Sequence, residues 1–234
     1  MADVNAQYNV AAPESLPVRI AAYQRRRMFD RFLQACGLPD PEATILDVGV
    51  TSDRTYEASN YLEAWYPHKH RVTACGVDDA SFLAELYEGM RFIKADALDL
   101  PFAERSYDVV HASAVIEHVG SAANQAKMIA EAARVCRRAF FITTPNRWFP
   151  VEFHTVLPLV HWLPPRIFRD IMRRTGRGFF AAEENLNLMT RTDLLRACSA
   201  AGLRDFDARV ETASLGFWPS NLLLIGLRRG GGAA

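Results

Sequence analysis

Lysine and cysteine are both scarce in this sequence of 234 residues, and their scarcity argues against several classes of protein. The lysines are Lys69, Lys94 and Lys127, so arginine carries most of the positive charge, and the formal net charge is zero. A neutral chain lacks the broad basic surface with which many proteins bind nucleic acid, so we expect no nucleic-acid partner. The four cysteines are scattered without a Cys-x-x-Cys pair, which argues against a structural zinc site and a disulfide framework.

Long apolar runs and an export signal are missing as well. No uninterrupted apolar run reaches the roughly 20 residues that a membrane-spanning helix needs. Residues 1–5 show neither the charged start nor the apolar core of a secretory signal, so we predict a cytoplasmic protein. Half of the residues are hydrophobic, and the chain is long enough for one α/β domain with a sizeable core.

Short apolar runs alternate with helical patterns along most of the chain. This alternation predicts right-handed βαβ units and a parallel sheet covered on both faces. The connection between the last two strands, which holds Gly216 to Ser220, is short enough to join an antiparallel pair. The expected strands are 44–48, 71–77, 90–93, 107–111, 139–143, 206–212 and 221–227, and the expected helices are 17–37, 56–65, 81–88, 122–135 and 191–201.

The whole chain, 1–234, is predicted to be a single domain with one insertion. Residues 1–16 are mixed and polar and are expected to form a loose arm before the N-terminal helix at 17–37. Residues 145–190 interrupt the alternation with aromatic, proline and arginine residues. Because this stretch follows the fifth strand, we expect it to contact the substrate or to act as a lid. Residues 230–234 are predicted to be a frayed tail.

Acidic residues and glycines stand at the ends of the expected strands. Asp47-Val48-Gly49 ends the first strand, and Gly76-Val77-Asp78 ends the second. Lys94 to Ala97 follows the third strand, and Ser106 to Ser113 runs through the fourth. Glycine lets the backbone pass close to a ligand, and an acidic residue at a strand end can accept hydrogen bonds from ribose hydroxyls. Any one of these acidic residues has the alternative role of a helix cap or turn former, so their order carries the argument.

This series of motifs resembles the class I methyltransferases that depend on S-adenosylmethionine (SAM), in particular the type 11 group, over about residues 45–144. The resemblance implies a Rossmann-like α/β fold whose seven-stranded, mostly parallel sheet ends in an antiparallel hairpin. It also implies SAM as cofactor and methyl transfer as activity. The residues that it implies for cofactor binding are Asp47, Gly49, Thr51, Asp78, Asp96, Ala97 and Ser113.

The stretch Val50 to Asp53 departs from this family, which usually has further glycines after the first one. SAM carries no phosphate, so the hydroxyls of Thr51 or Ser52 would suffice to contact its carboxylate. Alternatively, Ser52 or Asp53 caps the next helix. A third interpretation is a site too crowded for SAM, which would make the chain a non-catalytic, methyltransferase-like binding protein.

Glu117 and His118 follow the fourth strand and are the candidate catalytic residues. Methyl transfer depends mainly on in-line positioning, but a hydroxyl acceptor also needs a base, and histidine titrates near neutrality. We therefore expect O-methylation first, with N- and C-methylation open, and a structural histidine as the alternative. The segment is also similar to the ubiquinone-pathway O-methyltransferases, in which a further glutamate takes part in binding a divalent cation. Ala114 replaces that glutamate here, so we predict no metal site.

The segment after the fifth strand supplies candidates for substrate binding, which are Asn146, Arg147, Trp148 and His154. We expect a small-molecule acceptor, or one linked to a lipid or a glycan. His154 and His161 would share a face of one continuous helix, but Pro158 and the lack of a third ligand argue against a metal there. The sequence Thr-Pro-Asn at 144–146 differs from the signature of many base N-methylating enzymes, which argues against an RNA substrate.

Residues 164–180 combine arginines with apolar residues at helical spacing and end in an aromatic pair. This pattern predicts a basic amphipathic helix, and it has two interpretations. The helix either rests on an anionic membrane, which would make the protein peripheral to the membrane, or forms a lid with a solvated arginine face.

Overall fold

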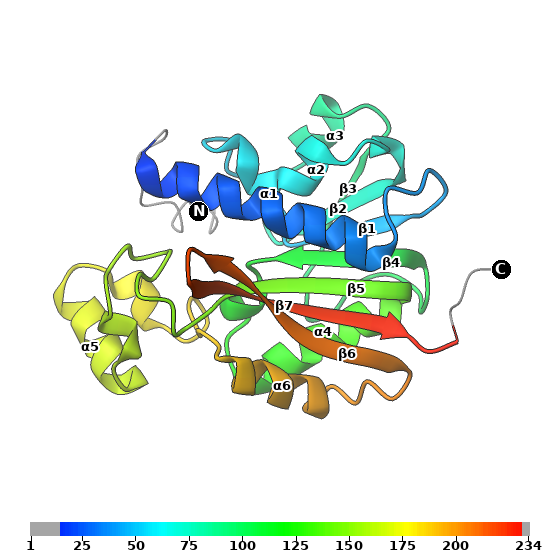
Figure 1. Cartoon of the computed structure of the whole chain (residues 1–234). Coiled ribbons are helices and arrows are strands. Elements are labelled where there is room, and N and C mark those ends of the chain that lie inside the picture. Colours follow the sequence, from blue (N-terminus) through cyan, green and yellow to red (C-terminus); the bar gives the residue numbers. More distant parts are fainter. Residues whose placement is uncertain (1–14, 231–234) are drawn as a thin grey trace.

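The structure is a computed structural model that describes residues 15–230, which form one sheet between two layers of helices (Figure 1). The predicted arm at 1–16 and the tail at 230–234 lie almost wholly outside the described residues, and so does the start of the chain, where no export signal is expected. No helix within the described range is long and apolar enough to cross a membrane.

Seven strands form the sheet in the order β3-β2-β1-β4-β5-β7-β6. The first five strands run parallel, and β7 lies antiparallel between β5 and β6. This arrangement confirms the predicted fold. The order reverses between β1 and β4, and ligands bind at the carboxyl ends of the strands beside such a reversal. The bounds are β1 Ile45–Val48, β2 Val72–Gly76, β3 Arg91–Lys94, β4 Tyr107–Ser113, β5 Cys136–Pro145, β6 Phe206–Leu215 and β7 Trp218–Arg228.

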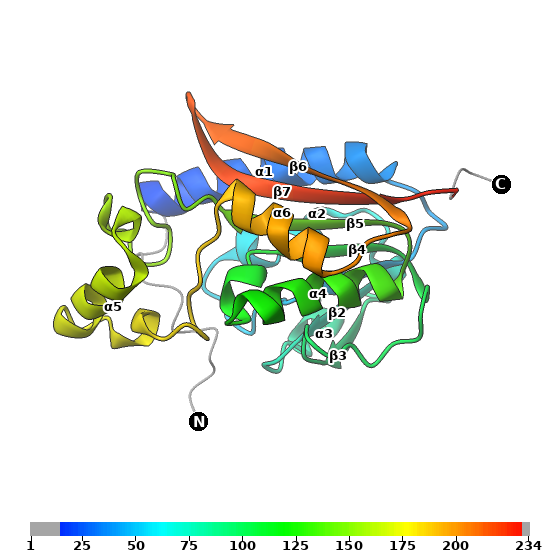
Figure 2. The same cartoon turned by 90° about the horizontal axis from the view of Figure 1, so that it is seen from below.

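Helices cover both faces of the sheet (Figures 1 and 2). One face packs against α1 (Leu16–Cys36), α2 (Tyr61–Trp65) and α3 (Phe82–Leu86), and the other against α4 (Ala122–Val135) and α6 (Arg191–Ala200). All four residues of β1 are buried, because its side chains alternate between the two apolar layers.

The ends of the main helices follow from local chemistry. The helix α1 ends at Gly37, whose φ of +65° is readily adopted only by glycine. The hydroxyl of Ser121 accepts a hydrogen bond from the Asn124 amide and so caps α4. Thr190 and Asp193 form a reciprocal capping box at the start of α6. These signals are local, which explains why the sequence predicts both ends of α4 correctly.

The C-terminal hairpin is longer and tighter than predicted. Gly216 and Phe217 alone connect β6 to β7, and Gly216 adopts a φ of +61° in the turn. Ser220 was expected in the connection, but it lies inside β7, where its buried hydroxyl bonds to the backbone oxygen of Ala213. The apparent turn residues are therefore strand residues, because their polar groups find partners within the hairpin.

The insertion after β5 forms a small cluster of its own beside the carboxyl end of the sheet (Figure 1). Its helix α5 (Pro165–Arg174) is shorter than the predicted 164–180, because Gly176 adopts a φ of +74° just after it. No continuous helix joins His154 to His161: a turn, an irregular stretch and an isolated bridge at Pro158 lie between His154 and the 3-10 helix Val160–Trp162 that holds His161. The residues buried in the cluster are Phe168, Met172, Phe180, Ala181 and Leu186.

Candidate active site

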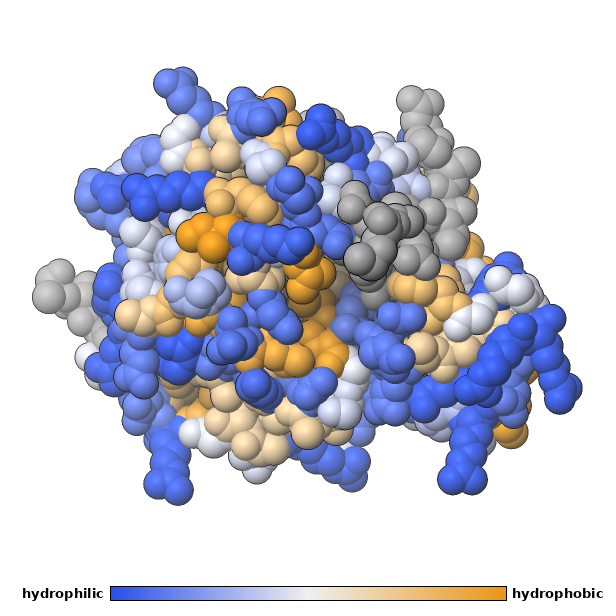
Figure 3. Space-filling view, turned by 180° about the vertical axis from the view of Figure 1, so that it is seen from behind, coloured by the Kyte–Doolittle hydropathy of each residue, from blue (hydrophilic) through white to orange (hydrophobic). Residues whose placement is uncertain are grey.

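A pocket of about 510 Å³ opens at the carboxyl ends of the parallel strands, and this volume suits a small organic molecule. In the view from behind, apolar residues surround a hollow that polar residues border (Figure 3). The pocket is lined by the ends of β1, β2 and β4, the loop after β3, one side of α1, and part of the insertion. The predicted cofactor residues that line it are Gly49, Thr51, Asp96, Ala97 and Ser113. Asp78 directly follows Val77, which also lines the pocket.

Two glycines keep the strand ends open. Gly49 has a φ of +89°, and a Cβ placed there would lie 2.2 Å from Cγ2 of Val115. A Cβ on Gly76 would lie 2.7 Å from the backbone oxygen of Val50. No larger residue fits at either position without displacing its neighbour. The backbone therefore borders the pocket directly at both strand ends, as a tightly wrapped cofactor requires.

The loop that lacks the expected glycines does not fill the pocket. Val50 is only 5 % exposed, and it packs in the apolar layer under α1 and α2. Asn60 braces Thr51 by accepting from its amide at 2.9 Å and donating to its backbone oxygen at 3.0 Å. Ser52 and Asp53 do not begin a helix; Oδ1 of Asp53 instead accepts from the amide and hydroxyl of Thr55. The residues present thus fit SAM in the available space.

Asp47 is not among the residues that line the pocket. Its side chain points to the α1 layer, where Nδ1 of His111 lies 2.6 Å from its Oδ1, and Nε2 of His111 lies 2.8 Å from the hydroxyl of Tyr61. Burial raises the pKa of Asp47 to about 7 and lowers that of His111 to about 4. Asp47 therefore belongs to a buried polar network beneath the first strand.

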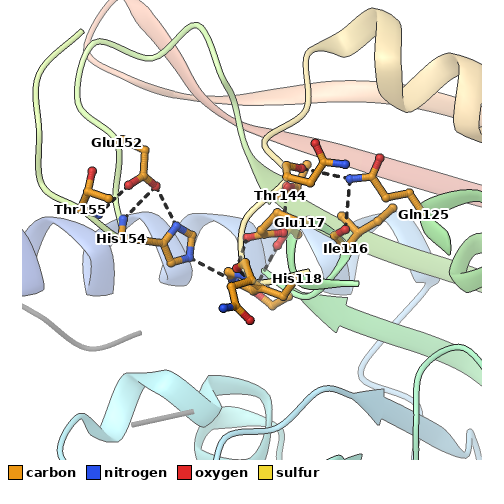
Figure 4. A network of polar contacts seen from close by, with 12 residues as sticks. Ile116, Glu117, His118, Gln125, Thr144, Glu152, His154 and Thr155 are labelled. Atoms are coloured by element: carbon orange, nitrogen blue, oxygen red, sulfur yellow. Dashed lines mark hydrogen bonds and ion pairs between the residues drawn. The ribbon is translucent and has the colours of Figure 1, made fainter. Parts of the chain in front are cut away.

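Two histidines meet at the wall of the pocket (Figure 4). Nε2 of His118 lies 3.1 Å from Nε2 of His154, which belongs to the insertion. Nδ1 of His118 donates to the backbone oxygen of Asn185 at 2.7 Å, and Nδ1 of His154 lies 2.7 Å from Oε1 of Glu152. Burial and the neighbouring His154 lower the pKa of His118 to about 3. The carboxylate of Glu152 outweighs the effect of burial and raises the pKa of His154.

Glu117 lies beside this pair and is completely buried. Its Oε2 accepts from the hydroxyl of Thr144 at 2.9 Å. Its Oε1 has no hydrogen-bond partner among residues 15–230 and lies 3.8 Å from Nε2 of His118. Burial raises the pKa of Glu117 to about 7. The predicted candidates Glu117, His118 and His154 are therefore brought together in one cluster.

The other residues predicted to bind substrate do not line the pocket. The amide of Asn146 donates to the backbone oxygen of Pro219, and the guanidinium of Arg147 donates to the backbone oxygens of His161 and Leu163. Trp148 is 48 % exposed and lies over Trp162. These contacts hold the start of the insertion against β7 and against its own later turns.

The first helix contributes a wall that the sequence analysis missed. Arg25 faces the pocket, and no carboxylate among the side chains that the structure describes forms an ion pair with it. The positive charge of Arg25 acts on His154 and lowers its pKa, against the larger effect of Glu152. The available signal was one arginine at helical spacing from the apolar residues Val18, Ala21 and Met28. The α1 residues of this wall are Val18, Ala21, Gln24, Arg25 and Met28.

Residues 46–141 match the family model described as a methyltransferase domain. A comparison with curated protein sequences finds no match.

Solved structures share the fold at low sequence identity. Magnesium protoporphyrin IX methyltransferase from Synechocystis PCC 6803, solved with bound SAH, is 16 % identical with a TM-score of 0.56, covering 95 % of this chain and 91 % of its own. The CurJ carbon methyltransferase is 10 % identical with a TM-score of 0.57, covering 88 % of this chain and 54 % of its own.

A third similar structure is a Haloferax volcanii chain in complex with the methyltransferase activator Trm112. It is 14 % identical with a TM-score of 0.53, covering 93 % of this chain and 99 % of its own. Residues 46–141 thus carry a methyltransferase domain, and the strand order and the open pocket at the carboxyl edge agree with a SAM-dependent methyltransferase that uses S-adenosylmethionine as its cofactor.

Proposed function

We propose that this methyltransferase acts on a hydroxyl oxygen of a small-molecule acceptor, or of one linked to a lipid or glycan. The observation that carries the proposal is the pair of imidazoles, His118 and His154, at the pocket wall. Because Nδ1 of His118 donates to a backbone carbonyl, its Nε2 holds a lone pair. In the proposed reaction the acceptor oxygen bonds to the methyl carbon, the bond from that carbon to sulfur breaks, and the hydroxyl proton passes to the histidine pair.

We assign the cofactor to the part of the pocket that is bordered by the strand ends. Gly49 and Thr51 would border the methionine part, and Asp78 would accept from the ribose hydroxyls. Asp96 and Ala97 would contact the adenine, and Ser113 would lie near the sulfonium. Asp47 would support the first strand from behind through His111, since its carboxyl is on the other side of the backbone.

The position of Arg25 supports a methyl acceptor that carries a negative charge. It borders the pocket near His154 and has no carboxylate partner among the described residues, so an anionic group would pair with it. The test compares Arg25→Gln with Arg26→Gln, because Arg26 is the neighbouring, exposed arginine. We expect KM for the acceptor to rise at least tenfold in the first variant alone. Equal KM values in both variants would contradict the assignment.

The direct test of the proposed reaction is product analysis. A cell extract is incubated with the enzyme and methyl-labelled SAM, and the labelled product is identified by mass spectrometry. We expect a methyl ether or ester, and a kcat at least a hundredfold lower for His118→Asn. A label on nitrogen or carbon would overturn O-methylation while leaving the methyltransferase activity intact.

Two other interpretations receive less support. A non-catalytic binding protein was suggested by the loop at 50–53, but Val50 is largely buried in the apolar layer under α1 and the loop leaves a pocket open beside it. A membrane surface at 164–180 is disfavoured because Phe168 and Met172 of α5 are buried within the insertion, although Ile167 is exposed. We therefore favour a lid with a solvated arginine face.

A further inference from the structure

Hydrogen bonds to other residues fix the orientation of both histidine rings at the pocket wall. A backbone carbonyl can only accept, so Nδ1 of His118 carries the hydrogen that bonds to Asn185. The carboxylate of Glu152 likewise holds a hydrogen on Nδ1 of His154. With both Nδ1 atoms acting as donors, the two Nε2 atoms face each other with their lone pairs at 3.1 Å. Two lone pairs at this distance repel unless a shared proton or a metal ion lies between them.

Glu117 places a carboxylate oxygen beside the two Nε2 atoms. Its Oε1 is buried and accepts no hydrogen bond within residues 15–230, although a buried carboxylate oxygen normally has a partner. One possible ligand atom each of Glu117, His118 and His154 lies within 4.8 Å of the other two, and Oε1 of Glu117 is 3.8 Å from Nε2 of His118. An unpartnered oxygen that faces two lone pairs is a second and independent sign that a cation belongs at this point.

We propose that Nε2 of His118, Nε2 of His154 and Oε1 of Glu117 form a binding site for a divalent transition-metal ion of the zinc type. Two imidazole nitrogens and one carboxylate oxygen are a common ligand set for zinc, whereas magnesium and calcium prefer oxygen ligands alone. Bonds of about 2.1 Å in a tetrahedral site place neighbouring donors roughly 3.4 Å apart. The two nitrogens, 3.1 Å apart, are close to this separation, and Oε1 of Glu117 lies a few tenths of an ångström beyond it from Nε2 of His118, at 3.8 Å.

The surroundings of the three donors fit the same conclusion. A histidine that binds a metal almost always donates its other nitrogen to a carboxylate or a backbone carbonyl, and here Glu152 and Asn185 are those acceptors. Both histidines line the pocket, so a fourth coordination position would be open to a ligand there. On the proposed function, the acceptor hydroxyl would take this position in the ion-bound form and release its proton to water, because the ion then occupies the Nε2 lone pairs that accept the proton in the ion-free form. That last step rests on the proposed function, but the binding of the ion does not.

The sequence analysis predicted no metal because Ala114 replaces a glutamate and the pair Glu117-His118 lacks a third ligand. The structure supplies a third donor from another part of the chain, His154, which lies 36 positions later. Its approach depends on how the insertion folds back over the end of β4. Sequence spacing therefore gives no sign of the cluster.

The test measures metal binding in the absence of SAM and acceptor. The tag-free chain is first treated with a chelator and then titrated with zinc chloride in a calorimeter, and with cobalt(II), whose visible absorption reports its ligands. We expect one ion per chain. His154→Gln and His118→Asn should each weaken zinc binding at least a hundredfold and abolish the cobalt absorption. Glu152→Gln should weaken it about 10- to 100-fold by releasing the His154 ring.

The matched control is His70→Asn, because His70 is an exposed histidine outside the cluster and its loss should leave the affinity unchanged. A thermal shift with SAM shows that each variant is folded. No zinc binding by the unaltered chain, or equal affinity in the folded His154→Gln and His70→Asn variants, would overturn the site. If His154→Gln does not fold, His118→Asn decides. A chain that binds zinc through these residues but methylates nitrogen would retain this site and lose only the proposed O-methylation.

Discussion

Gly49 shows how a single missing side chain keeps the cofactor pocket open. Two separate penalties apply to any other residue there, a φ of +89° and a Cβ only 2.2 Å from Val115. Gly176 has a similar φ of +74°, but no atom lies within 4 Å of its virtual Cβ. Substitutions at Gly49 and Gly176 can therefore be compared to separate the cost of backbone strain from the cost of a steric clash.

We predict that Gly49→Ala lowers the free energy of unfolding by about 3 kcal/mol, and Gly176→Ala by about 1 kcal/mol. Gly49→Ala should also weaken SAM binding, because Val115 must move and it lines the pocket. Urea denaturation measures the first effect and calorimetric titration with SAM the second. Equal losses of stability in the two variants would mean that the contact with Val115 contributes nothing.

Asp47 illustrates what the sequence can and cannot predict about one residue. The motif at the end of the first strand pointed to the edge of the sheet at which the pocket opens. The direction of the Asp47 side chain depends on strand alternation, which places Leu46 and Val48 in one apolar layer and Asp47 on the opposite side. A strand of four wholly buried residues carries no polar alternation from which that direction could have been predicted.

At the scale of elements, α1 is tied to the far edge of the sheet by one ion pair. Arg31 on α1 donates two hydrogen bonds to Glu211 on β6, at 2.7 and 2.6 Å. These bonds lower the pKa of Glu211 from 4.5 to about 2. Because α1 also forms a wall of the pocket, this pair helps to fix that wall.

We predict that Glu211→Gln destabilises the protein by about 1 kcal/mol at pH 7, since the pair is partly exposed. The lowered pKa means that the folded state favours the ionised carboxylate. The contribution is therefore complete above about pH 5 and disappears as the pH falls towards 2. Urea denaturation of both proteins between pH 7 and 3 should show a difference that shrinks on acidification.

The control for this prediction is Asp30→Asn, which removes an exposed pair between Asp30 and Arg26 on the same helix. We expect no measurable change in that variant. A destabilisation by Glu211→Gln that stays constant down to pH 3 would show that packing, and not the charge, is what the substitution removes.

Elements with strong local signals are predictable from this sequence, and elements held by distant partners are not. The bounds of α4 follow from its capping serine and apolar periodicity. The hairpin strands extend beyond their predicted ends because Ser220 finds its partners on Ala213 and Gln24, the latter 196 positions away. The pocket wall formed by α1 was missed for the same reason, since only the fold brings that helix to the strand ends.

At the scale of the whole molecule, the cofactor should act as a stabilising ligand. SAM at about 100 times its Kd adds roughly 2.7 kcal/mol, which corresponds to an increase in Tm of about 5–10 °C for a chain of this size. We predict that Asp78→Ala removes this shift, whereas Asp79→Asn retains it, because Asp79 only caps the turn at Ser81. Differential scanning fluorimetry with and without SAM measures both. An unchanged shift in Asp78→Ala would exclude the proposed ribose contact.

The position of β7 has a consequence for how the protein is made. This strand is the last of the seven in the chain, yet it lies inside the sheet and provides the only strand partner of β6 within residues 15–230. During synthesis, the five parallel strands leave the ribosome first and can pair with each other. Both edges of β6 stay unpaired until β7 has been made. A chain truncated after residue 217 would thus lack β7. The edge of β5 and both edges of β6 would be unpaired, and unpaired strand edges promote aggregation.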